Sequence, residues 1–164
     1  MTSEFLLWKT AHILSATVLF GTGLGIAFFC WFGYRGALRA NEIAALRSVL
    51  RLTVIGDACF TAPAIVLQIV SGLVLVHMLG WSLASPWAAA SIALFALAGA
   101  CWLPVVVIQI RLLREARQAS SIDALPAGFH RRFRRWFALG VPAFAALVVV
   151  FYLMVAKPVS LSAF

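Results

Sequence analysis

Four long apolar runs, separated by arginine-rich segments, dominate this sequence. Because a hydrocarbon core about 30 Å thick is crossed by about 20 helical residues, each run is long enough to span a membrane. Lipid offers no partners for backbone N–H and C=O groups, so each span must be a helix, and the alternation typical of barrel strands is missing. We therefore predict an all-α, integral membrane four-helix bundle in which residues 1–164 form a single domain. The expected spans run roughly from Phe5 to Phe32, from Leu52 to Leu79, from Trp87 to Ile110 and from Phe137 to Ala156.

The distribution of charge predicts how this bundle is oriented. Charged residues make up 11% of the chain, whereas a soluble domain has about 25%. A net charge of +8 would indicate nucleic acid in a soluble protein, but here the basic residues flank apolar runs, so no nucleic-acid partner is expected. The positive-inside rule places the first and third connecting segments in the cytoplasm and both termini outside. Their arginines either report topology alone or also bind anionic lipid head groups. These residues are Arg35, Arg39, Arg47, Arg51, Arg111, Arg114, Arg117, Arg131, Arg132, Arg134 and Arg135.

Lys9 and His12 place an ammonium and an imidazole inside the first span. A separation of three residues is about 4.5 Å of helical rise, so both side chains project to nearly the same face. Charged groups within a span are costly and count as functional candidates. In one interpretation, Lys9 extends to the interface and His12 hydrogen-bonds across the bundle. In the other, His12 is an axial ligand of haem iron and Lys9 pairs with a propionate or an anionic substrate. The positive charge of Lys9 then disfavours protonation of His12 and keeps its imidazole neutral.

Asp57, Thr61, Gln68 and Ser71 form a polar stripe on the second span. Their spacing places them within about 80° of one another on an ideal helix, so we expect the stripe to face the interior of the bundle. Asp57 lies near the expected cytoplasmic end of this span. We therefore expect it to pair with Arg51 or another loop arginine, and a role in a proton relay is the alternative.

Two further polar residues lie within spans. His77 is near the outer end of the second span, at a depth comparable with that of His12, which makes it a candidate second axial ligand of haem. It is 20 residues from Asp57 and about 200° away on an ideal helix, unless Pro63 changes its direction, so an interfacial histidine is the alternative. Gln109, on the third span, indicates an interhelical hydrogen bond.

Short motifs along all four spans carry a family resemblance. They are Leu7-Trp8-Lys9, residues 11–16, residues 20–25, Thr61-Ala62-Pro63 with Gln68 and Gly72, Trp102-Leu103-Pro104 with Gln109-Ile110-Arg111, and Gly140-Val141-Pro142. On these motifs, the whole chain resembles an uncharacterised family of small bacterial integral membrane proteins of unknown function. The resemblance implies a multi-pass protein of the bacterial inner membrane and conveys no established activity.

The first span is also distantly similar to that of the membrane protoporphyrinogen oxidases of haem biosynthesis, a four-helix family thought to bind b-type haem. That family opens with a similar pattern of Trp, Lys, Ala and His, and only Lys9 and His12 carry over as candidate functional positions. It continues with a further histidine near the end of the first helix, where this chain has Phe29-Cys30-Trp31-Phe32-Gly33. The resemblance therefore implies haem binding more than porphyrinogen oxidation.

These features predict a protein that binds a b-type haem or a quinone-like redox cofactor near the periplasmic side and acts in electron transfer or haem metabolism. The expected cofactor-binding residues are His12, Lys9 and His77, with the two histidines as iron ligands. Whether the protein is a haem- or quinone-linked oxidoreductase is left open. One alternative is a non-enzymatic accessory or assembly subunit of a membrane complex, and another is a small-molecule transporter, which the similar plan of the two helix pairs favours weakly. The apolar helix faces are also compatible with a homodimer or a larger complex.

Overall fold

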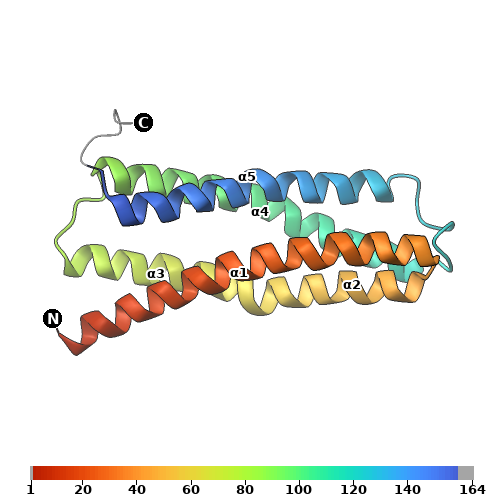
Figure 1. Cartoon of the computed structure of the whole chain (residues 1–164), viewed down its shortest axis with the longest axis horizontal. Coiled ribbons are helices and arrows are strands. Elements are labelled where there is room, and N and C mark those ends of the chain that lie inside the picture. Colours follow the sequence, from red (N-terminus) through yellow and green to blue (C-terminus); the bar gives the residue numbers. More distant parts are fainter. Residues whose placement is uncertain (1, 159–164) are drawn as a thin grey trace.

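The computed structural model describes residues 2–158 as long helices joined by short connections (Figure 1). Within these residues, four helical stretches are long and apolar enough to cross a membrane, which confirms the predicted all-helical bundle. The second of them is one stretch of 36 residues made of three consecutive elements, α2, η1 and α3. The elements are α1 (Ser3–Ala40), α2 (Ile43–Gly56), η1 (Asp57–Thr61), α3 (Ala62–Met78), α4 (Pro86–Gln118) and α5 (Phe129–Ala156).

The helices extend well beyond the predicted spans at one end of the bundle, where the α1–α2 and α4–α5 connections lie; we call this the arginine-rich end. The segment expected as the first loop is almost entirely helical, because α1 continues to Ala40 and α2 begins at Ile43. Between them, Asn41 adopts the left-handed conformation with φ of 54°, and the N–H of Glu42 donates to the carbonyl of Ala37 at 2.9 Å. This is a Schellman ending, which stops α1 and reverses the chain within two residues.

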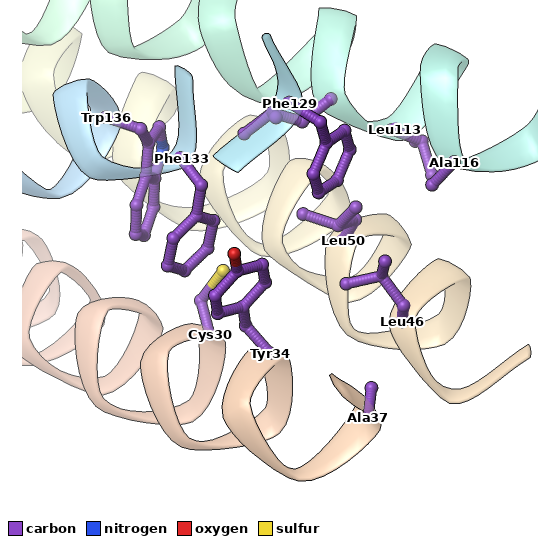
Figure 2. Packing of buried hydrophobic residues seen from close by; sticks show 11 residues of the cluster. Cys30, Tyr34, Ala37, Leu46, Leu50, Leu113, Ala116, Phe129, Phe133 and Trp136 are labelled. Carbon is purple, nitrogen blue, oxygen red and sulfur yellow. The ribbon is translucent and has the colours of Figure 1, made fainter. Parts of the chain in front are cut away.

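A cluster of buried apolar side chains holds the arginine-rich end together (Figure 2). Phe129 and Phe133 are 0% and 1% exposed, and the ring of Phe133 stacks on that of Tyr34 with 3.7 Å between centroids. Because this end extends beyond a hydrocarbon core of about 30 Å, burial here is driven by the hydrophobic effect, as in a soluble domain. The cluster comprises Cys30, Tyr34, Ala37, Leu46, Leu50, Leu112, Leu113, Ala116, Phe129, Phe133 and Trp136.

Two arginines at this end join helices through polar contacts. Arg47 donates from Nε to the carbonyl of Ala116 at 2.9 Å and from Nη2 to that of Ala119 at 2.6 Å. These two carbonyls lie at the C-terminal end of α4, where backbone carbonyl groups have no N–H partner within the helix. Arg47 therefore caps the end of α4 from α2. Arg132 pairs with Glu115 at 2.6 Å and joins α5 to α4.

The spans form two pairs, with α1 packed along α2 and α3, and α5 packed along α4. The main contact between the pairs is that of α2 with α4, and Figure 1 shows α3 well separated from α4 and α5. At the end opposite the arginines, Lys157 Nζ lies 4.1 Å from the ring centroid of Trp81, on the α3–α4 connection. The two pairs are therefore joined most closely at the arginine-rich end.

Candidate functional site

His12 lies between α1 and α3 and uses both ring nitrogens in hydrogen bonds. Ser71 Oγ is 2.9 Å from Nδ1, and Gln68 Nε2 is 3.0 Å from Nε2. Because the Ser71 hydroxyl donates to the carbonyl of Leu67 at 2.5 Å, it accepts from Nδ1–H, and the lone pair on Nε2 accepts from the Gln68 amide. This arrangement assigns a neutral imidazole that carries its hydrogen on Nδ1.

The remaining contacts fix the amide of Gln68 and the position of the ring. Ser15 Oγ donates to Gln68 Oε1 at 2.5 Å, which directs the amide nitrogen of Gln68 toward His12. A Cβ at Gly72 would lie 3.2 Å from Cε1 of His12, so this glycine allows the ring to approach α3 closely. The interhelical hydrogen bonds expected in one interpretation of His12 are therefore present. We call His12, Ser15, Gln68 and Ser71 the α1–α3 lock.

The other expected haem residues do not gather around His12. Lys9 and His77 are both exposed, and Lys9 Nζ lies 5.9 Å from the ring centroid of Phe5. An axial ligand of haem needs a free imidazole nitrogen, whereas both nitrogens of His12 are engaged. Within residues 2–158, no group of three or more His, Cys, Asp or Glu side chains is placed to hold a metal ion. As arranged, these residues do not fit haem, and its ligation by His12 stays a prediction that requires Gln68 to leave Nε2.

Asp57 contacts α4 and no arginine. Trp102 Nε1 donates to its two carboxylate oxygens at 3.2 and 3.1 Å, and Gln109 Nε2 donates to Oδ2 at 2.7 Å. None of the ion pairs among residues 2–158 involves Asp57, so the expected pairing with Arg51 is wrong. The reason is helical phase: the two residues are six apart, about 120° around the helix, and Arg51 is exposed while Asp57 is buried.

Trp136, on α5, completes this group of buried polar side chains. Its Nε1 donates to Gln109 Oε1 at 3.1 Å. An indole N–H can only donate, so the amide oxygen of Gln109 must face Trp136 and its amide nitrogen must face Asp57. Asp57, Gln109 and Trp136 are 7%, 2% and 5% exposed. We call Asp57, Trp102, Gln109 and Trp136 the Asp57 network; it connects η1, α4 and α5.

A single turn of π-helix, η1, shapes the backbone at Asp57 and Thr61. The N–H of Ala62 donates to the carbonyl of Asp57, five residues back. Pro63 explains the wider turn, because it has no N–H and its ring clashes with the carbonyl four residues before it. Thr61 is 5% exposed, and its Oγ1 has no hydrogen-bond partner among residues 2–158.

Asp57 and Thr61 line a cavity of about 410 Å³ whose walls come from all four spans. This volume is within the range of about 300 to 1,000 Å³ that is typical of small-molecule sites. Gly23, Gly99 and Gly140 line it from α1, α4 and α5, and a Cβ at any of the three would meet no atom within 4 Å. Small residues therefore create the space, and most other lining side chains are apolar or aromatic.

All four residues of the polar stripe are buried or half-buried, as expected, but they belong to two different sites. Gln68 and Ser71 belong to the α1–α3 lock, whereas Asp57 and Thr61 line the cavity. The sequence did not indicate the indole donors of Trp102 and Trp136. Gln109 was expected to form an interhelical bond, and it forms two.

Comparison with known proteins places the chain in a family. The family described as "Predicted integral membrane protein (DUF2269)" matches residues 6–158. The chain belongs to this family. Membership confirms that the chain belongs to an integral membrane protein family of unknown function and agrees with the four spans. The family description names no activity. No curated protein and no solved structure matches the chain, so the similarity to protoporphyrinogen oxidases is not shown.

Proposed function

We propose that this protein is a membrane carrier for a small, mostly apolar molecule that binds in the cavity. The observation that carries the proposal is the hydroxyl of Thr61, which lies buried in the cavity wall and has no partner among the residues that the structure describes. Leaving a buried hydroxyl unsatisfied costs about 1 to 3 kcal/mol. A bound molecule with one polar group would satisfy it, while its apolar part contacts the rest of the wall.

The position and backbone of the site support carriage as well as binding. Asp57 follows the start of α2 by 14 residues, about 21 Å of helix, and so lies within the 36-residue stretch, away from both of its ends. Transporters bind their substrates near the membrane midplane, between helix groups and at helices with irregular backbone. Here η1 supplies the irregular backbone, and the cavity lies between the two helix pairs.

The redox predictions differ in how well the described residues support them. A quinone has carbonyl oxygens that the Thr61 hydroxyl could meet, so it is a neutral candidate for the same cavity. Haem at His12 would first have to displace Gln68. The absorption spectrum of the protein purified after expression with ample haem tests the haem prediction: a Soret band that disappears in His12→Ala would favour haem over the proposal made here.

Binding is tested on the protein in lipid nanodiscs by quenching of tryptophan fluorescence, since Trp102 and Trp136 line the cavity. The probes are decylubiquinone, which is neutral, and tetraphenylphosphonium, a hydrophobic cation. We expect at least one to bind saturably. If decylubiquinone binds, Thr61→Val should weaken its binding by about fivefold, the value of one hydrogen bond from the Thr61 hydroxyl to a quinone carbonyl. Thr53→Val is the matched control, because Thr53 is buried two turns earlier and already bonds to the carbonyl of Val49 at 3.0 Å.

Two outcomes would contradict the proposal. Absence of saturable binding for both probes would refute the site itself. Saturable binding without uptake of the same probe into proteoliposomes would refute carriage and leave a binding protein.

We also propose that the arginine-rich end faces the cytoplasm of a bacterial inner membrane, where its arginines meet anionic lipid head groups. In a variant without the native cysteines, Ser82→Cys and Ser120→Cys report the two ends of the bundle; both serines are exposed. A membrane-impermeant maleimide added to cells should label the first variant only, and the second after permeabilisation. The opposite pattern would reverse the orientation.

A further inference from the structure

Resting on the proposed function, we infer that the molecule bound in the cavity is a hydrophobic organic cation whose charge is balanced by the carboxylate of Asp57. The cavity and Thr61 alone leave the chemical class of the ligand open. Three features define it: the hydrogen-bond directions around Asp57, the ion pairs of the bundle and the side chains that line the cavity.

The side chains that hydrogen-bond to the carboxylate of Asp57 are placed as donors. The indole of Trp102 has an N–H and no acceptor, and it contacts both oxygens. The amide of Gln109 could present either end, but Trp136 binds its oxygen and directs its nitrogen to Asp57 Oδ2. Both oxygens of Asp57 are therefore held as acceptors, which is the arrangement that suits an ionised carboxylate.

An ionised carboxylate that is 7% exposed within a membrane-spanning helical stretch needs a compensating positive charge. Among residues 2–158, the ion pairs are those of Glu115 with Arg111 and Arg132, both at the arginine-rich end. The N–H groups of Trp102 and Gln109 reduce the cost of desolvating Asp57 and supply no net charge. Acidic residues within spans pair with another group or mark the path of a substrate or ion. Since Asp57 lines the cavity, a cation there would provide the positive charge that no ion pair within residues 2–158 supplies.

The walls of the cavity define the rest of the ligand. Phe95, Trp102, Phe137 and Phe144 line it, and aromatic rings attract cations while excluding water. A small hydrated metal ion would leave most of these apolar surfaces without a partner. An anion would be repelled by Asp57, so an organic ammonium or phosphonium with aromatic or alkyl substituents is the class that matches both features. A polar atom on one substituent would meet the hydroxyl of Thr61.

The test compares two ions of nearly the same size and shape and opposite charge, tetraphenylphosphonium and tetraphenylborate, on the full-length protein in nanodiscs. Protein-free nanodiscs correct for partition into lipid. Asp57→Asn removes the charge at nearly constant size, and Asp123→Asn, at an exposed position, is the matched control. Gly99→Leu fills the cavity without changing a side chain of the Asp57 network.

We expect tetraphenylphosphonium to bind at least about tenfold more tightly than tetraphenylborate, and Asp57→Asn or Gly99→Leu to weaken its binding by at least about tenfold. The Asp123→Asn control should stay within about twofold of the unaltered protein. If Asp57→Asn does not fold, two measurements still test the inference. They are the preference of the unaltered protein for the cation and the loss of tetraphenylphosphonium binding in Gly99→Leu. Equal binding of the two ions, or binding of decylubiquinone alone, would overturn the cation and leave the proposed function standing. Binding of none of the probes would overturn both.

Discussion

Replacing His12 by Phe tests whether this residue holds α1 against α3. The substitution keeps a planar ring but removes the hydrogen bonds of 2.9 Å to Ser71 and 3.0 Å to Gln68. Interhelical hydrogen bonds in membranes contribute about 0.6 kcal/mol on average and at most about 1.7. With two bonds lost and the Gln68 amide left without its acceptor, we expect the free energy of unfolding to fall by about 1 to 3 kcal/mol.

The assay is reversible unfolding in mixed micelles, with His77→Phe as the matched control because His77 is exposed on α3. Gln68→Leu should be destabilising as well, and the double variant should lose less than the sum of the two single changes, by about 0.6 kcal/mol or more. Strictly additive losses, or a His12→Phe protein as stable as the control, would refute the lock. If His12 were a haem ligand instead, the loss would require bound haem and would be absent from haem-free protein.

Two further predictions concern the arginine-rich end. Arg47→Met should lower the free energy of unfolding by about 1 to 3 kcal/mol, because it removes two charge-assisted bonds to the last carbonyls of α4, whereas Arg51→Met should change it by less than about 0.5. Equal losses in the two variants, measured by unfolding in micelles, would show that capping contributes nothing. Phe133→Ala should cost about 3 to 5 kcal/mol, since the ring is 1% exposed, and Phe32→Ala, 56% exposed, should be nearly neutral in the same assay.

The spans could be predicted from the sequence, but not their ends. Run length and apolar composition give a strong signal inside the bilayer, where backbone groups have no alternative to a helix. Beyond the bilayer that constraint disappears, and the arginines of α1 and α5 are as compatible with a helix as with a loop. What continues α1 to Ala40 is packing of side chains such as Tyr34 against Phe133, which depends on a helix about 100 residues away in the chain. A local pattern does not contain that contact.

The sequence also predicts that the polar stripe faces the interior of the bundle. It does not predict which side chains hydrogen-bond to the stripe. Charge alone predicts an arginine partner for Asp57, because arginine is the obvious counter-ion in a basic chain. Helical phase instead turns Asp57 toward the indole and amide donors of α4. Trp102 and Trp136 resemble ordinary apolar residues in a sequence. Their donor capacity becomes specific only when the fold brings them to one carboxylate and one amide.

The π-turn explains how one stripe serves two sites. On an uninterrupted helix, Asp57, Thr61, Gln68 and Ser71 would share one face and meet one neighbouring helix. A π-turn adds one residue, which rotates the part of the helix before it by about 100° relative to the part after it. Gln68 and Ser71 can then bond to α1 while Asp57 bonds to α4. Pro63, whose missing N–H favours the wider turn, thus separates the α1–α3 lock from the cavity. The lock bonds α3 to α1, while Asp57 and Thr61 line the cavity.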